Sequence, residues 1–224
     1  MKTSSIIKAA LSAACVVMIA ASANADAITY TFYNLTHNVG NTDVGSQLSV
    51  DVTGSGSTVS FRFFNNVGTA SSICDIYFAD GPLLEISSIT DSDGPTAGKS
   101  GKAVAFSSLA KPSELPGGNN ASPTFITTEG FSADSDSPVQ PSGVNAAGEW
   151  VQIDFDLKAG KTFLDTITAL NSGALRIGLH IQGIGATGGS DSYINRVPDG
   201  GITVALLGSA LVGIGLLRRK FSRN

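Results

Sequence analysis

Residues 47–65 read QLSVDV-TGSGS-TVSFRFFN, and this stretch decides the fold class. Apolar residues alternate with polar ones on both sides of the central TGSGS. They are Leu48, Val50 and Val52 before it, and Val59, Phe61 and Phe63 after it. Such alternation is typical of strands that bury one side and expose the other. Because residues 53–57 are all small and flexible, we predict a turn there and an antiparallel hairpin.

Further segments of this kind occur along the chain. We expect strands at 28–34, 73–79, 83–90, 102–107, 151–157 and 175–181. Short strands with one apolar face each predict an all-β fold, an antiparallel β-sandwich of about eight strands. One short helix is expected within 161–172, with Thr162 as N-cap, Asp165 three residues later and Gly173 as C-cap. We expect this helix to cover one end of the sandwich.

The folded part of the chain is predicted to span residues 26–196, enough for one domain with a sizeable core. This part carries 17 acidic and 8 basic side chains, a net charge of −9, whereas the whole chain carries −4. An acidic domain does not bind nucleic acid electrostatically. It contains one cysteine, Cys74, so no internal disulfide can form, and we expect a buried thiol.

Residues 111–148 differ from the rest because Pro, Gly, Ser and Asn dominate them. Three apolar residues, Phe125, Ile126 and Phe131, are scattered through the segment as possible anchors. We predict a long loop. Loops of this length inside a compact domain are often functional.

The first 25 residues have the pattern of a cleavable signal peptide. Lys2 and Lys8 precede the apolar stretch 9–21, and Ala23 and Ala25 form a small-x-small cleavage site. We therefore expect residues 1–25 to be removed and the mature chain to begin at Asp26.

The last 28 residues, 197–224, have three parts. A Pro/Gly motif comes first, made of Val197, Pro198, Asp199, Gly200 and Gly201. An uncharged apolar run over 202–217 follows, which predicts a transmembrane helix of about 24 Å. A basic end over 218–224 closes the chain, with Arg218, Arg219, Lys220 and Arg223. The positive charges predict that this end stays in the cytoplasm and that the domain lies outside.

This order of motif, apolar helix and basic end resembles the PEP-CTERM class of bacterial sorting signals. The motif is similar to the VPDSG variant, with Gly200 in place of serine. The resemblance implies export, transient anchoring in the inner membrane, and processing near the motif by an exosortase-type enzyme. The protein would then reach the cell surface or the medium.

Phrases in the body of the chain, spread over residues 46–195, are also similar to proteins that carry such tails. Examples are SQLSVDV, LPGGNN and GGSDSYIN. The resemblance implies a surface-associated protein of bacteria that make exopolysaccharide. It implies no enzymatic activity and no established binding residues.

The residues themselves offer little catalytic chemistry, since no G-x-S-x-G, H-E-x-x-H or metal-type cysteine pair occurs. We expect that the protein is not an enzyme and needs no cofactor. His180 is interpreted as a solvent-exposed side chain. Calcium is an alternative ligand because short acidic turns occur, although aspartates in turns usually serve turn geometry. The candidate ligands are Asp91, Asp93, Asp134 and Asp136.

Two functions remain open for the domain. One is a structural or interaction component of the cell surface or biofilm matrix. The other is a carbohydrate-binding β-sandwich that uses the 111–148 loop or a sheet face, with calcium as an optional ligand of the binding site. Exposed aromatic rings that can stack on sugars would favour the second function. The candidates are Trp150, Tyr77 and Tyr193, with Phe64 beside them.

Overall fold

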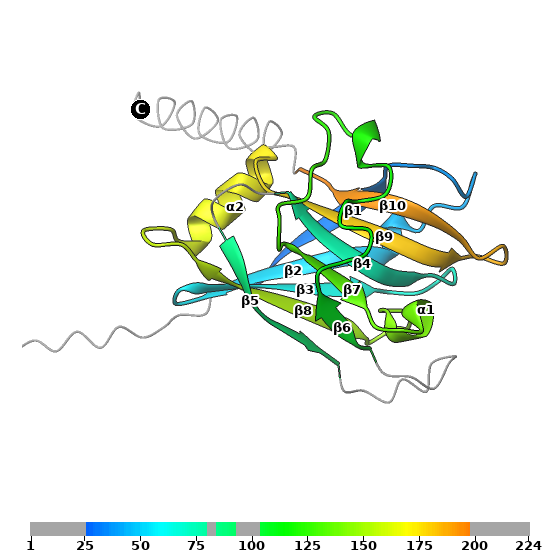
Figure 1. Ribbon diagram of the computed structural model, residues 1–224, viewed down its shortest axis with the longest axis horizontal. Helices are drawn as coiled ribbons and strands as arrows, with labels where there is room; N and C mark the ends of the chain where they lie inside the picture. The colour runs from blue at the N-terminus through cyan, green and yellow to red at the C-terminus, as the bar shows by residue number, and fades with distance from the viewer. Residues whose placement is uncertain (1–25, 80–83, 93–103, 198–224) are drawn as a thin grey trace, which may run out of the picture.

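The computed structural model describes residues 26–79, 84–92 and 104–197 (Figure 1). These residues form ten strands, two short α-helices and two 3-10 turns. The strands are β1 (Ile28–Asn34), β2 (Leu48–Ser55), β3 (Thr58–Asn65), β4 (Ser72–Ala79), β5 (Leu84–Asp91), β6 (Phe106–Ser108), β7 (Ser132–Ser135), β8 (Trp150–Leu157), β9 (Arg176–Ile184) and β10 (Gly189–Asn195). The helices are α1 (Val139–Ser142) and α2 (Phe163–Ser172), and the 3-10 turns are η1 (Gly45–Gln47) and η2 (Gly118–Asn120).

All pairings between these strands are antiparallel, and the strand order is β5-β8-β3-β2-β1-β10-β9-β4-β7-β6. The prediction of an all-β antiparallel fold is confirmed. The predicted number of about eight strands was too low, and the two layers are joined into one sheet. The reason is β1, which pairs with β2 through Ile28–Thr31 and with β10 through Phe32–Asn34. The end strands β5 and β6 contact each other, so the sheet is nearly barrel-like.

The main core lies between the two halves of this sheet. Phe61 of β3 and Phe155 of β8 come from one half, and Phe78 of β4 comes from the other. The Phe78 ring lies 5.1 Å from Phe61 and 4.7 Å from Phe155, in edge-to-face geometry. The apolar residues of the alternating pattern, such as Phe61 and Phe155, therefore point into the core as predicted.

The hairpin predicted at 47–65 is present. Strands β2 and β3 pair along their whole length, from Leu48 opposite Asn65 to Ser55 opposite Thr58. Gly56 in the turn has a φ of 62°. A positive φ at the first turn position favours glycine, as in type II′ hairpins. The predicted turn residues 53–55 instead continue β2, because the turn needs only two residues.

The predicted helix is α2, and its capping is confirmed. Thr162 and Asp165 form a capping box, and Gly173 ends the helix with a left-handed φ of 73°. Ile167 and Leu170 are buried against the core. Phe163 lies on the backbone of Gly54, where a Cβ atom would come within 2.6 Å of its ring. The helix thus connects β8 to β9 and covers one end of the main core (Figure 1).

The segment predicted as a long loop, 111–148, contains β7, α1 and η2. Its first half covers the outer face of β4, β9 and β10 with a second apolar cluster, which we call the outer cluster. Its buried members are Tyr77, Ala79, Ala110, Leu115, Ala121, Phe125 and Ile194. Leu115 and Phe125 lie directly on Gly178 of β9, where a Cβ atom would meet them at 2.8 and 3.0 Å. The first half of this segment therefore packs against the sheet as part of the folded domain. Among the apolar residues expected as anchors, Phe125 and Phe131 are buried, and Ile126 is 65% exposed.

Candidate functional site

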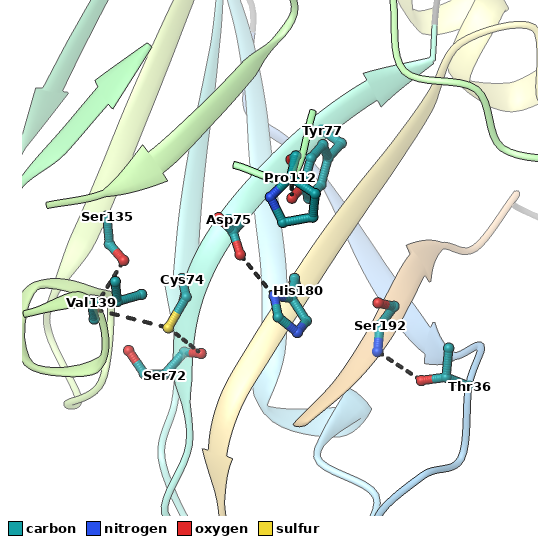
Figure 2. A network of polar contacts seen from close by, with 10 residues as sticks. All are labelled: Thr36, Ser72, Cys74, Asp75, Tyr77, Pro112, Ser135, Val139, His180 and Ser192. Carbon is teal, nitrogen blue, oxygen red and sulfur yellow. Dashed lines mark hydrogen bonds and ion pairs between the residues drawn. The ribbon is translucent and has the colours of Figure 1, made fainter. Parts of the chain in front are cut away.

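A row of polar side chains crosses the outer face of four neighbouring strands. Asp134 of β7 pairs in register with Asp75 of β4, Asp75 pairs with His180 of β9, and His180 pairs with Ser192 of β10. Figure 2 shows the His180 ring between Asp75 and Ser192. These residues are far apart in the sequence, so the sheet topology alone brings them together.

Asp75 and His180 form the central contact of this row. The Nδ1 atom of His180 lies 2.8 Å from Oδ2 of Asp75. The Asp75 side chain is 2% exposed and that of His180 is 15% exposed. The prediction that His180 is simply solvent-exposed was therefore wrong, because the neighbouring strands and the 111–148 segment cover most of it. A carboxylate partner holds a proton on Nδ1 and fixes the ring, which leaves Nε2 as the nitrogen available for another contact.

Asp134 lies on the other side of Asp75. Burial, the charge of Asp75 and a hydrogen bond between the two carboxyl groups raise the pKa of Asp134 to about 6. A protonated Asp134 donates to Asp75, while two ionised carboxylates at this position repel each other.

This shift predicts that Asp134 makes the domain less stable as the pH rises. The pKa in the folded state lies above the usual value of 3.8, so the folded state holds the proton more tightly than the unfolded state does. The contribution of Asp134 to the free energy of unfolding is therefore greatest below pH 4. It falls as the pH rises from about 4 through about 6 and is constant once Asp134 is ionised in the folded state as well. Because the carboxyl group is only half-buried, we expect a change on the order of 1 kcal/mol.

The measurement is urea denaturation of the wild-type and Asp134→Asn chains at several pH values between 4 and 8. We expect the variant to lose less stability than the wild type over this range. Asp156→Asn is the matched control, since Asp156 lies on an exposed strand face and accepts one hydrogen bond from Thr58 at 3.3 Å. Identical pH profiles for wild type and Asp134→Asn would contradict the prediction.

Two hollows are lined in part by strand β9. The first, here the His180 hollow, has a volume of about 160 Å³. Its polar lining is Thr36, Asn38, Asn120, His180, Ser190, Asp191 and Ser192. The second, here the Gln182 hollow, has a volume of about 190 Å³. It is lined by Ala70, Ser71, Ser72, Gln140, Pro141, Asn145, Gln182 and Gly183. His180 and Gln182 are alternate residues of β9, so they lie on the same face about 7 Å apart. The 111–148 segment supplies one wall of each hollow.

The His180 hollow is shaped by a buried carboxylate. Asp191 of β10 is 1% exposed. It accepts hydrogen bonds from the side chains of Asn34 and Thr36 and from the backbone N–H groups of Asn38 and Val39. These four donors all belong to the chain around the end of β1. Asp191 therefore fixes the loop that forms the wall opposite the 111–148 segment.

The aromatic residues predicted to stack on sugars occupy other places. Tyr77 and Tyr193 are fully buried, so their rings cannot contact a sugar, and this prediction was wrong. The strand parity placed Tyr77 on an outer face correctly, but the outer cluster covers it and its hydroxyl donates to the Pro112 carbonyl at 3.0 Å (Figure 2). Trp150 is half-buried opposite Phe64 on the other half of the sheet, and the Arg62 guanidinium lies 4.3 Å from its ring centroid.

The predicted calcium ligands do not converge. Asp134 contacts Asp75, and Asp136 accepts a hydrogen bond from Ser107 at 2.7 Å. Asp91 is the last residue of β5, and Asp93 lies outside the described residues. Within the described part of the chain, no group of three or more His, Cys, Asp or Glu residues is placed to hold a metal ion.

Cys74 is buried, as expected. Burial raises the pKa of its thiol to about 12, and the thiol donates to the Ser72 carbonyl at 3.6 Å. It therefore stays protonated and packs as a small apolar residue.

The predicted signal peptide, with Ala23 and Ala25, lies outside the described residues, as do motif residues 198–201, the apolar run 202–217 and the basic residues after it. Val197 is described and is 43% exposed. No helix among the described residues is long and apolar enough to cross a membrane.

The chain thus combines an all-β domain with a C-terminal tail that directs sorting. The tail matches the VPDSG-CTERM motif over residues 196–221, and it is a PEP-CTERM-like sorting signal. A motif of this kind implies an exported protein that an exosortase-type enzyme processes. Searches of curated proteins and of solved structures find no match to the chain.

Sequence reasoning missed Asp75, Asp191 and Gln182. The signal for Asp75 was its position inside the otherwise apolar ICDIYF, where a carboxylate needs a partner. For Asp191, the surrounding GSDSYIN has only two apolar residues, and strand β10 was not predicted at all. Nothing in the sequence indicates that Gln182 lines a hollow.

Proposed function

We propose that this protein is a non-enzymatic component of the bacterial cell surface or extracellular matrix, delivered by its C-terminal tail. The observation that carries the proposal is the VPDSG-CTERM match at residues 196–221, directly after the last strand of the domain. Export explains the composition as well, because an acidic domain of net charge −9 is soluble and does not bind nucleic acid. After release from the inner membrane, the domain itself is the part that interacts.

The proposal predicts the ends of the mature chain. We expect mass spectrometry of the exported protein to find a chain that begins at Asp26 and ends near residues 197–201. In cells that lack the exosortase-type enzyme, the chain should keep its apolar tail and stay with the inner membrane. A tail with Val197–Gly201 replaced by alanines is the matched control and should also remain unprocessed. An exported protein that still ends at Asn224 would contradict the proposal.

A second candidate function is carbohydrate binding, and the hydroxyl- and amide-rich lining of the two hollows favours it. Hydroxyl and amide groups line both hollows, His180 and the hydrogen-bonded carboxylate of Asp191 also line the His180 hollow, and the Gln182 hollow has no charged residue. A binding module of this kind would attach the displayed domain to extracellular polysaccharide. The test is an array of oligosaccharides with and without EDTA, since loss of binding with EDTA would indicate that calcium takes part.

A further inference from the structure

We propose that the His180 hollow and the Gln182 hollow together form one binding site for a neutral oligosaccharide, with a sugar unit in each. The inference rests on the carbohydrate-binding function proposed above and gives it a location and a ligand class. The site runs along the outer face of β9. One wall of both hollows is the 111–148 segment; the opposite wall is the loop after β1 at the His180 hollow and residues 70–72 at the Gln182 hollow.

The lining selects for a neutral ligand. The Gln182 hollow contains only uncharged residues, and Asp191, the carboxylate that lines the His180 hollow, accepts four hydrogen bonds from the protein. A phosphate or sulfate group would need Arg or Lys, and neither lines the hollows. Amides and hydroxyls both donate and accept, as the hydroxyl groups of a sugar do.

Several of these polar groups are available for a ligand. Within the described residues, the side-chain amides of Gln182 and Asn120 make no hydrogen bond to the protein, and each lines a different hollow. In contrast, Asn145 donates to three backbone carbonyls, those of Gln140, Pro141 and Gly143. Asn145 therefore shapes the wall, while Gln182 and Asn120 are placed to contact a ligand.

His180 adds an oriented polar group to the His180 hollow. Its Nδ1 is bound to the buried Asp75, so Nε2 is the ring nitrogen left for a ligand in the hollow that His180 lines. A sugar hydroxyl can donate to this nitrogen. Asp75 is in this respect a positioning residue, since it sets the orientation of the ring without reaching the ligand.

The size of the hollows fits sugar units better than a large cofactor. Each, at about 160 and 190 Å³, is smaller than the roughly 300–1,000 Å³ of pockets that enclose drug-sized ligands. The spacing of about 7 Å between alternate residues of β9 places two adjoining units of one chain side by side.

The test uses the exported chain, an array of neutral and acidic oligosaccharides, and calorimetry with the neutral oligosaccharide that binds most tightly. We expect Gln182→Ala and Asn120→Ala each to weaken binding about 3- to 10-fold, as the loss of one hydrogen bond does. Gln152→Ala is the matched control, because Gln152 is an amide on the outer face of the other half of the sheet. Circular dichroism verifies that all variants fold.

Each outcome has a separate meaning. Binding that is weakened by Gln182→Ala and Asn120→Ala but not by Gln152→Ala supports the site. Neutral oligosaccharides that bind with unchanged affinity to both hollow variants would overturn the location and keep the carbohydrate-binding function. Binding of acidic oligosaccharides alone would overturn the ligand class. An array without any binder would overturn both the site and that function.

Discussion

Replacing Phe78 by alanine is expected to lower the free energy of unfolding by about 3–5 kcal/mol, the cost of removing a fully buried aromatic side chain. Phe78 is 0% exposed and lies at the centre of the main core. Its ring is 5.1 Å from Phe61, 6.2 Å from Phe63 and 4.7 Å from Phe155, each edge-to-face. The variant leaves a cavity where the two halves of the sheet meet, so neither half can collapse onto the space.

The measurement is urea denaturation of the exported chain followed by circular dichroism. Phe64→Ala is the matched control, because Phe64 is adjacent to Phe63 but points to the outer face and is half-buried. We expect it to cost less than half as much. Equal losses for the two variants would mean that the core is not organised around Phe78, and the packing of the two halves described above would be wrong.

The sequence predicted those elements whose pattern is local. The β2–β3 hairpin follows from alternation around a Gly/Ser turn, and α2 follows from its capping residues and apolar spacing. Strand β10 was missed because both of its faces are covered, so that Asp191, Ser192 and Asn195 are buried polar residues and no alternation remains. Strand β7 was missed because its four residues, SADS, have no apolar side beyond one alanine.

The candidate site could not be predicted, because it depends on which strands become neighbours. His180 and Asp75 are separated by 105 residues and meet only because β9 pairs with β4. Counting alternate residues placed His180 on the outer face of the sheet, which is correct. The same counting cannot show that residues 111–148 return over that face and bury part of it. For this reason Tyr77 was taken as exposed, and the long segment was taken as a loop.

Replacing Asp191 by alanine is expected to cost about 2–4 kcal/mol and to release the loop after β1. The carboxylate accepts from the side chains of Asn34 and Thr36 and from two backbone N–H groups, and each donor that stays buried without a partner destabilises the folded state by roughly 1–3 kcal/mol. The expected sum is smaller than four full penalties, because an exposed loop can move and let water reach the donors.

Two measurements separate this effect from a general loss of stability. Urea denaturation gives the free energy of unfolding, and hydrogen exchange of the exported chain reports on the amides of Asn38 and Val39. Both amides should lose protection in Asp191→Ala, whereas amides in the β2–β3 hairpin should keep theirs. Asp51→Ala is the matched control, since Asp51 lies on an exposed strand face and accepts a hydrogen bond from Thr29 at 2.6 Å. We expect it to change stability by at most about 0.5 kcal/mol. If Asp191→Ala behaves like Asp51→Ala in both measurements, the loop is held by other contacts, and Asp191 does not fix the wall of the His180 hollow.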